Sequence, residues 1–371
     1  MIDVRVERAP ACEAGGRTCM PLALQNLIIT GRARLMSMPT DAGYPSLTDR
    51  LTPVEAGAYV VAATFLGGAA AFALGDGAVL FVGDEGELRV PAHDGGVVST
   101  AVAPNLLVTG GDDGKVLKFA AGDTPEPVGE AKGWIDAVAI GPDGAVAWSA
   151  GKKVFARDGK GDVRTFESPS AVRGLAFAPK GYQLAVARYN GVSLWFPRTE
   201  GAPKELTWKG SHIDVVFAPD GKFVVTTMQE NALHGWRLSD GAHMRMTGYP
   251  GKVRSVDWTA DGKWLASAGA DAAVVWPFQS KDGPMGKAPK ELGIRPARVS
   301  RVAAHPKAPV VALGYEDGCI LLARLSDGAE ILGRNPGEGG PITALGWDRI
   351  GSRIAFGTED GKAGIVALPE G

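Results

Sequence analysis

The chain is long, rich in glycine and almost neutral. It has 371 residues, of which 52 are Gly, about twice the usual share, and 25 are Pro. Its 39 Lys and Arg nearly balance 41 Asp and Glu, which argues against a dedicated nucleic-acid-binding protein or a polybasic membrane-surface protein. The glycines exclude a protein of long helices, because each interior Gly costs a helix about 1 kcal/mol. We therefore expect a folded all-β chain with many turns.

The cysteines and the N-terminal sequence indicate the compartment. Cys12, Cys19 and Cys319 are an odd and sparse set, which gives no disulfide framework and is typical of a reducing environment. No apolar segment follows a basic start, so we expect no secretory signal and a cytoplasmic protein.

Residues 1–46 lie outside the repeats described below and form an N-terminal extension. We expect residues 1–40 to be poorly ordered, because they show no periodic pattern. Met36 and Met38 stand shortly before the repeats. One interpretation is that translation begins there in the cell and that the preceding residues are an artefact of gene assignment.

The stretch 56–75 carries no charge and is long enough to span a bilayer. Its several Gly and many Ala make its hydrophobicity modest. We favour two buried strands joined at Gly67 and Gly68 over a transmembrane helix.

From about residue 57 onward the sequence repeats every 40 residues or so. Each unit has an apolar strand with alternating pattern followed by a turn such as Pro219-Asp220-Gly221. Pro and Gly at such fixed offsets favour tight turns, and the period indicates one supersecondary unit per repeat. The eight units, numbered 1 to 8 below, begin at Val60, Val97, Ile135, Val172, His212, Val253, Val299 and Ile342.

Three more strands follow in each unit. The second is exemplified by 223–227, the third by 273–276 and a more polar fourth by 205–208. Four antiparallel strands in about 40 residues are typical of a β-propeller blade.

The units resemble WD40 repeats, and the resemblance covers residues 50–371. Trp195, Trp236 and Trp276 stand where that family has its third-strand Trp, and Ser-Asp-Gly at 239–241 and 326–328 stands where it has the following Asp. The resemblance implies a single WD40-like propeller over residues 47–371.

The resemblance also implies a structural tetrad of His, Ser or Thr, Asp and Trp inside a blade. Unit 2 matches it best, and other units lose most members, so the propeller is divergent. The matching residues are His93, Thr109, Asp113 and, in the Trp position, Phe119.

The number of units predicts eight blades, with seven as the alternative if unit 1 is something else. The last unit ends after its third strand, at 363–368, and lacks a fourth. Arg50, Leu51 and Thr52, just before unit 1, can supply it. We expect this N-terminal strand to close the ring, which removes two exposed sheet edges.

The sequence gives no support for catalysis. His234 and His243 stand nine residues apart without a third ligand nearby, and Cys319 has no neighbouring base. We therefore expect no catalytic residue, no metal site and no cofactor. Because some propellers are enzymes, a propeller enzyme or small-ligand binder that uses the central channel remains the alternative.

A partner site is implied by the resemblance. WD40-like propellers usually bind peptides or proteins on the narrow face, through the residues one before and one after the first apolar residue of each unit. The positions one before are Tyr59, Gly96, Trp134, Ala171, Ser211, Lys252, Arg298 and Pro341, and those one after are Val61, Val98, Asp136, Arg173, Ile213, Arg254, Ser300 and Thr343.

These positions combine four bases, two aromatic residues and one acid. Aromatic residues and Arg are the usual composition of interface hot spots. We expect a monomeric interaction scaffold that receives a protein or peptide with an acidic segment, and no nucleic acid or membrane. The expected partner-binding residues are Tyr59, Trp134, Asp136, Arg173, Lys252, Arg254 and Arg298.

Overall fold

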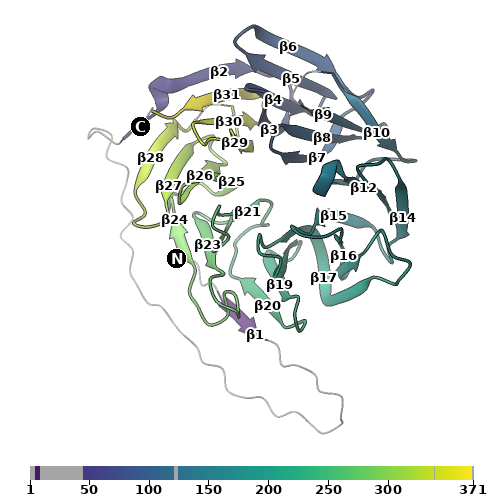
Figure 1. Cartoon of the computed structure of the whole chain (residues 1–371). Helices are drawn as coiled ribbons and strands as arrows, with labels where there is room; N and C mark the ends of the chain where they lie inside the picture. The colour runs from purple at the N-terminus through teal and green to yellow at the C-terminus, as the bar shows by residue number, and fades with distance from the viewer. Residues whose placement is uncertain (1–4, 9–44, 121–123, 338, 370–371) are drawn as a thin grey trace.

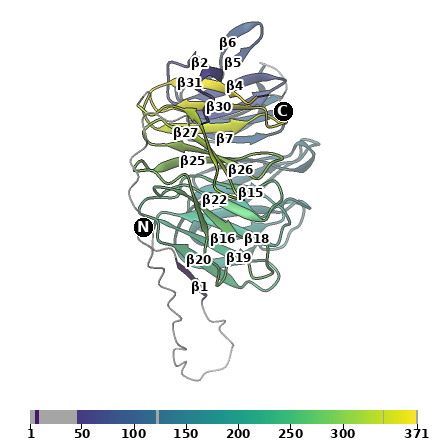
Figure 2. The ribbon, with the colours of Figure 1, turned by 90° about the vertical axis from the view of Figure 1, so that its left-hand side faces the viewer.

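The computed structural model describes residues 5–8, 45–120, 124–337 and 339–369. Its antiparallel sheets are arranged as a ring around a central axis (Figure 1), which is a flattened disc when viewed from the side (Figure 2). The part described contains β-strands and two short 3-10 turns but no α-helix. The chain is therefore a single all-β propeller, as the repeats predict.

Units 1 to 3 each form one four-stranded sheet in which sequence neighbours pair. The first strands lie innermost and contact one another around the ring, for example β3 with β7. The strands are β3 (Val60–Leu66), β4 (Ala69–Leu74), β5 (Ala78–Gly83), β6 (Gly86–Pro91), β7 (Val97–Ala103), β8 (Leu106–Gly111), β9 (Lys115–Ala120), β10 (Glu126–Glu130), β11 (Ala137–Ile140), β12 (Val146–Ala150), β13 (Lys153–Arg157) and β14 (Val163–Glu167), with the 3-10 turn η2 (Pro142–Gly144) between β11 and β12.

The uncharged stretch 56–75 forms β3 and β4. They are joined at Gly67 and Gly68, whose φ values of 59° and 99° lie in the left-handed region that favours glycine. The prediction of two buried strands is confirmed, and no helix in the described residues is long and apolar enough to cross a membrane.

Units 4 and 5 share one continuous strand, β17. Its first half pairs with β16 and its second half with β18, which joins both units in a seven-stranded sheet. The strands are β15 (Val172–Phe177), β16 (Leu184–Trp195), β17 (Lys204–Phe217), β18 (Phe223–Met228), β19 (Ala232–Arg237), β20 (His243–Thr247) and, at the edge beside β20, β1 (Arg5–Arg8).

The described strands consequently form seven hydrogen-bonded sheets. The prediction of eight separate blades is wrong as a count of sheets, and the alternative number, seven, agrees. The expected reason for seven does not hold, because unit 1 forms its own sheet. The number falls by one because β17 does not break between units 4 and 5.

Units 6 to 8 complete the ring. The fourth strand of unit 8 is β2, which pairs with β31 from the C-terminal end, so the predicted closure is confirmed. The strands are β21 (Val256–Trp258), β22 (Trp264–Ser267), β23 (Ala273–Pro277), β24 (Lys290–Leu292), β25 (Val299–Ala304), β26 (Val310–Tyr315), β27 (Ile320–Arg324), β28 (Glu330–Arg334), β29 (Ile342–Trp347), β30 (Arg353–Thr358), β31 (Lys362–Ala367) and β2 (Leu51–Glu55).

The segment before β2 lies against unit 7. Ser46 forms a parallel bridge with Leu332 of β28, and Leu47 is buried between units 7 and 8 before the 3-10 turn η1 (Thr48–Arg50). Residues 9–44, where most of the expected disorder falls, lie outside the described residues.

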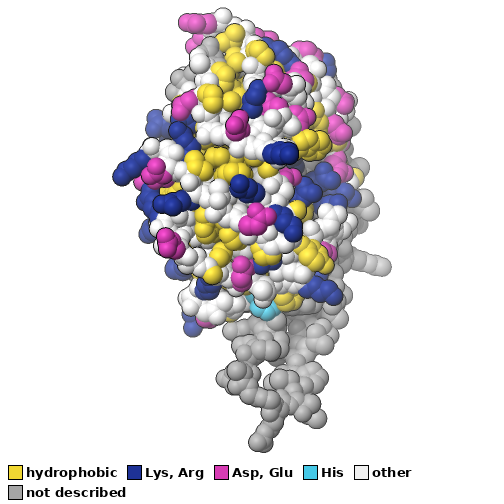
Figure 3. Space-filling model, turned by 90° about the vertical axis from the view of Figure 1, so that its right-hand side faces the viewer, with side chains coloured by type: hydrophobic (Ala, Val, Ile, Leu, Met, Phe, Trp, Pro, Cys, Tyr) yellow, Lys and Arg dark blue, Asp and Glu magenta, His cyan; other side chains and the backbone are white. Residues whose placement is uncertain are grey.

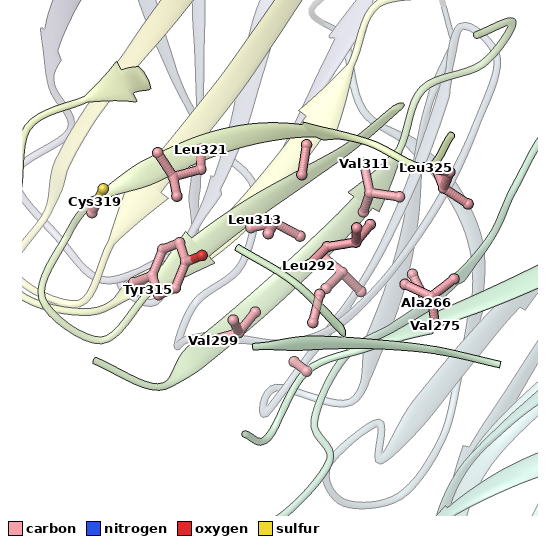
Figure 4. Close-up of a cluster of buried hydrophobic side chains, with 14 residues drawn as sticks. Ala266, Val275, Leu292, Val299, Val311, Leu313, Tyr315, Cys319, Leu321 and Leu325 are labelled. Carbon is pink, nitrogen blue, oxygen red and sulfur yellow. The ribbon is translucent and has the colours of Figure 1, made fainter. Parts of the chain in front are cut away.

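The hydrophobic core lies between neighbouring sheets. Between units 6 and 7, Val275 and Leu292 from one side pack with Val311, Leu313 and Leu321 from the other (Figure 4). Burying each such side chain contributes about 1.5–3 kcal/mol. Packing between successive sheets holds the ring together and fixes the relative positions of the inner strands.

Candidate functional site

A β-bulge recurs at the same place in most units. After the first residue of the inner strand, the register with the second strand shifts by one residue in units 1, 2, 4, 5, 7 and 8. Such a bulge leaves the extra residue unpaired and changes the direction of its side chain. The extra residues are Val61, Val98, Arg173, Ile213, Ser300 and Thr343.

These six residues are the predicted positions one after the first apolar residue. In units 3 and 6 the inner strands begin later, at Ala137 and Val256, and Asp136 and Arg254 precede them. The side of the disc at which the inner strands begin is here called the narrow face. Of the six extra residues, Val98 and Arg173 are exposed, whereas Thr343 is buried and its Oγ1 donates a 2.7 Å hydrogen bond to Val60 O.

Three exposed apolar residues stand where the inner strands of units 1 to 3 begin, and they are here called the apolar arc: Tyr59, Val98 and Trp134. Their exposed fractions are 42%, 42% and 65%. Units 1, 2 and 3 are consecutive in the ring, because the inner strand β7 contacts both β3 and β11. Val98 is one of the predicted positions one after the first apolar residue, but it is not among the predicted partner-binding residues, which are all aromatic or charged.

The predicted basic residues do not behave as one group. Arg173 lies 3.5 Å from Asp136, and Arg298 lies 3.3 Å from Glu316. Lys252 and Arg254 have no ion-pair partner among the described residues and line a common pocket. The structure therefore brings together Asp136 with Arg173 and Lys252 with Arg254, and leaves Arg298 paired separately.

The pocket lies between units 5 and 6 and has a volume of about 330 Å³. Asp214 of β17 is exposed to solvent there, but the surrounding protein desolvates its carboxylate and raises its pKa to about 6. The hydrogen bond that it accepts from Val215 N, at 2.8 Å, opposes this shift only in part. The lining residues are Ile213, Asp214, Thr227, Gln229, Lys252 and Arg254.

Further charged groups of the inner strands were missed by sequence reasoning. Burial raises the pKa of Asp257 to about 6 and lowers the pKa of Arg301. Arg301 donates hydrogen bonds to the carbonyl oxygens of Thr343, at 2.5 Å, and Ser300, at 3.1 Å, but has no carboxylate partner in the described part of the chain. Charged residues within otherwise apolar inner strands were the signal that could have revealed them.

A larger hollow of about 510 Å³ lies where β17 leaves β16. Among its lining residues are Arg188, Tyr189 and Trp208. The buried Arg188 guanidinium already donates to Ser193 Oγ, at 3.0 Å, and to Glu205. Its hydrogen-bonding capacity is thus largely used within unit 4.

The structural tetrad of unit 2 is assembled around His93. Its Nδ1 lies 3.0 Å from Asp113 Oδ1, and its Nε2 lies 2.9 Å from Thr109 Oγ1. Burial opposes ionisation of Asp113, but hydrogen bonds from Lys115 N, His93 and Asp94 N together lower its pKa. Phe119 is fully buried and contributes packing, including a ring contact with Phe81, rather than a hydrogen bond.

Unit 6 contains a related network that the repeat pattern did not predict. Trp276 Nε1 donates a 2.6 Å hydrogen bond to Tyr249 Oη, which lies 2.6 Å from Ser267 Oγ. Tyr249 takes the part that His93 plays in unit 2. Because Tyr249 replaces the family's His at this position, a pattern based on His does not reveal the network.

His234 and His243 stack on each other rather than converge on one point. Their ring centroids are 5.2 Å apart, and both contact the Trp208 ring. Burial and the neighbouring His243 and His212 lower the pKa of His234 to about 2. Among the residues described, no group of three or more His, Cys, Asp or Glu is placed to hold a metal ion.

The ring of antiparallel sheets defines a β-propeller, and the His93 and Tyr249 networks resemble the structural tetrad of WD40 repeats. The family model for the WD domain, G-beta repeat, matches residues 243–276. A second model, the anaphase-promoting complex subunit 4 WD40 domain, matches residues 303–371. With the fold, these matches support a divergent WD40-repeat propeller, the family that the repeats resemble.

The chain is similar to curated WD repeat-containing proteins. WD repeat-containing protein 55 of Mus musculus is 24% identical over 213 residues, which are 55% of this chain and 53% of that protein. WD repeat-containing protein 1-B of Xenopus laevis is 33% identical over 82 residues, 21% of this chain and 14% of that protein. The match thus spans about half the length of the first relative and less of the second.

Among solved structures, the computationally designed Ika8 protein is similar in fold. The TM-score is 0.69 with 18% sequence identity, and the match covers 88% of this chain and 100% of that one. At this identity the likeness concerns the fold alone.

Proposed function

We propose that this propeller is a non-catalytic interaction scaffold that binds a partner peptide or protein segment on its narrow face. The apolar arc would take an apolar side chain of the segment, and the bases of units 4, 6 and 7 would take its acidic part. The proposal includes a monomeric, cytoplasmic protein that binds neither nucleic acid nor membranes.

The observation that carries the proposal is the exposure of Trp134. A Trp that is 65% exposed leaves large apolar surface in water, and Tyr59, at the equivalent position of unit 1, and Val98 of unit 2 are each 42% exposed. Burying aromatic anchors of this kind supplies much of the binding energy at protein interfaces. By contrast, the side of the disc shown in Figure 3 mixes both signs of charge with small apolar patches.

The electrostatics favour an acidic segment over a basic one. Lys252 and Arg254 have no ion-pair partner in the described structure. The carboxylate of Asp136, by contrast, accepts a 2.6 Å hydrogen bond from Gly151 N and forms an ion pair with Arg173. Charge complementarity of this kind mainly raises association rates and specificity. The WD-repeat relatives support the general role of an interaction scaffold.

The test uses a photo-crosslinking amino acid in place of Trp134 in the full chain in cells. The matched control carries it in place of Phe196, which is 42% exposed and follows β16 in unit 4, away from the narrow face. We expect adducts to a defined protein from position 134 alone. Equal adducts from both positions would contradict the proposal.

A further inference from the structure

The pocket between units 5 and 6 has two walls of opposite character. Unit 5 supplies the Asp214 carboxylate, the Thr227 hydroxyl and the Gln229 amide. Lys252 and Arg254, which precede the inner strand of unit 6, supply two cations. No N···O distance between Asp214 and either cation falls within ion-pair range in the described structure, so the two walls face the same space without neutralising each other.

Thr227 provides an independent indication of a missing ligand. It pairs directly with Asp214 across β17 and β18, and only 2% of its surface is exposed. Its hydroxyl has no hydrogen-bond partner among the described residues. An unpaired buried hydroxyl costs free energy, so its place in the wall of a pocket favours a ligand or an ordered water that supplies the partner.

We propose that this pocket binds a small zwitterion of the α-amino acid class. The ligand's carboxylate lies against Lys252 and Arg254, and its ammonium lies against Asp214 with Thr227 as a further hydrogen-bond partner. A volume of about 330 Å³ is sufficient for a small molecule. A purely acidic ligand would leave Asp214 unpaired, and a purely basic one would leave both cations unpaired.

The inference does not rest on the proposed partner site, although Lys252 and Arg254 belong to both. Ligand binding would neutralise these two cations and thereby reduce the attraction of the narrow face for an acidic segment. Regulation of partner docking by a small metabolite would follow, and this consequence, unlike ligand binding itself, rests on the proposed function.

The protonation of Asp214 predicts the direction in which ligand affinity changes with pH. Asp214 titrates near pH 6, and the ionisable groups that share its pocket are Lys252 and Arg254, while β18 presents the uncharged Thr227 and β15 approaches at Gly174. An ammonium ligand needs the ionised carboxylate, so its affinity falls as the pH drops below about 6. A ligand that used only the cations would bind more tightly under the same change.

The experiment is a titration of the purified full chain with the standard L-amino acids, followed by saturation-transfer NMR. Each binder is compared with its deaminated and decarboxylated analogues, such as propionate and ethylamine for L-alanine. We expect at least one amino acid to bind with a dissociation constant below about 10 mM. We expect the single-charge analogues to bind at least about tenfold more weakly, because each loses a charged hydrogen bond.

Matched variants locate the site. D214N and R254Q should each weaken binding about tenfold, and D214N should also remove the pH dependence. D257N and R324Q should bind as the parent does, because Asp257 has a similarly raised pKa outside the pocket and Arg324 is an exposed arginine of β27 in unit 7, also outside it. If R254Q does not fold, K252Q provides the same test at the other cation of the pocket.

Three results would overturn the proposal. One is the absence of binding by every amino acid at about 10 mM. Another is equal binding of amino acids and their deaminated analogues with affinity rising at low pH, which would assign the pocket to an acidic side chain of the partner. The third is an equal loss of amino-acid binding in D257N and D214N, which would show that the loss does not arise from the pocket.

Discussion

Val54 of β2 is paired with Ala363 of β31, so residues from the two ends of the propeller lie side by side in one sheet. Val54 is also buried in the cluster between units 8 and 1. The ring is thus closed by both backbone pairing and side-chain packing.

This closure predicts a stability cost for V54A. Removing two buried methyl groups should lower the free energy of unfolding by about 2 kcal/mol. Urea unfolding followed by tryptophan fluorescence measures it. L88A is the control, because Leu88 is an exposed residue of β6, the fourth strand of unit 1. Equal stability of V54A and L88A would show that β2 does not close the ring.

The hydrogen bond between Trp276 and Tyr249 gives a second prediction. Y249F removes the hydroxyl and leaves the buried Trp276 Nε1 without its acceptor. The free energy of unfolding should therefore fall by about 1–3 kcal/mol. Y189F removes an exposed hydroxyl and should change little. Thermal unfolding of both variants distinguishes the network from a general effect of losing a Tyr hydroxyl.

Asp257 gives a prediction about pH. Burial raises its pKa from 3.8 to about 6, so the folded state holds its proton more strongly than the unfolded chain does. Its contribution to stability therefore falls as the pH rises from about 4 to about 6, and the cost is fully present above that range. A shift of about two units corresponds to at most about 3 kcal/mol.

D257N should consequently be more stable than the parent at about pH 7.5 and close to it at about pH 4. The Asn side chain keeps an oxygen that can accept the hydrogen bond from Ala304 N, which is 2.8 Å long in the parent. Urea unfolding at the two pH values provides the measurement. A difference that does not depend on pH would contradict the assignment to this carboxyl group.

The continuity of β17 predicts sensitivity at Gly210. Its φ of 131° is unfavourable for other residues, and an added Cβ would lie 2.6 Å from Met228 Cε. G210A should lose about 1–3 kcal/mol of stability. G201A is the control, because Gly201 has nothing within 4 Å of an added Cβ. Equal stability of the two variants in urea would show that the link between units 4 and 5 tolerates a side chain there.

Much of the fold could be predicted from local sequence. The repeated Pro-Asp-Gly turns and alternating strands indicate the antiparallel units, and the missing fourth strand after Ala367 indicates closure by residues near Leu51. The unbroken β17 could not be predicted, because residues 208–210 resemble an ordinary connection between units. Whether that connection breaks the strand depends on the angle between two sheets.

The site was less accessible to sequence reasoning. The repeat predicts that Tyr59 and Trp134 stand where inner strands begin, and both are exposed. Asp214 and Arg254 lie in different units, and the pocket that they line depends on packing between sheets. The ion pair between Arg298 and Glu316 likewise depends on which loop lies beside Arg298. The basic residues that the sequence predicts as one cluster are therefore separate in the structure.

The most direct measurement for the partner-binding proposal is the affinity of the crosslinked partner, once purified, for the double variant Y59A/W134A. We expect it to bind at least about a hundredfold more weakly than to the parent, because two exposed aromatic anchors are removed. The F196A variant should bind as the parent does. Unchanged affinity of Y59A/W134A, or an equal loss in F196A, would contradict binding on the narrow face.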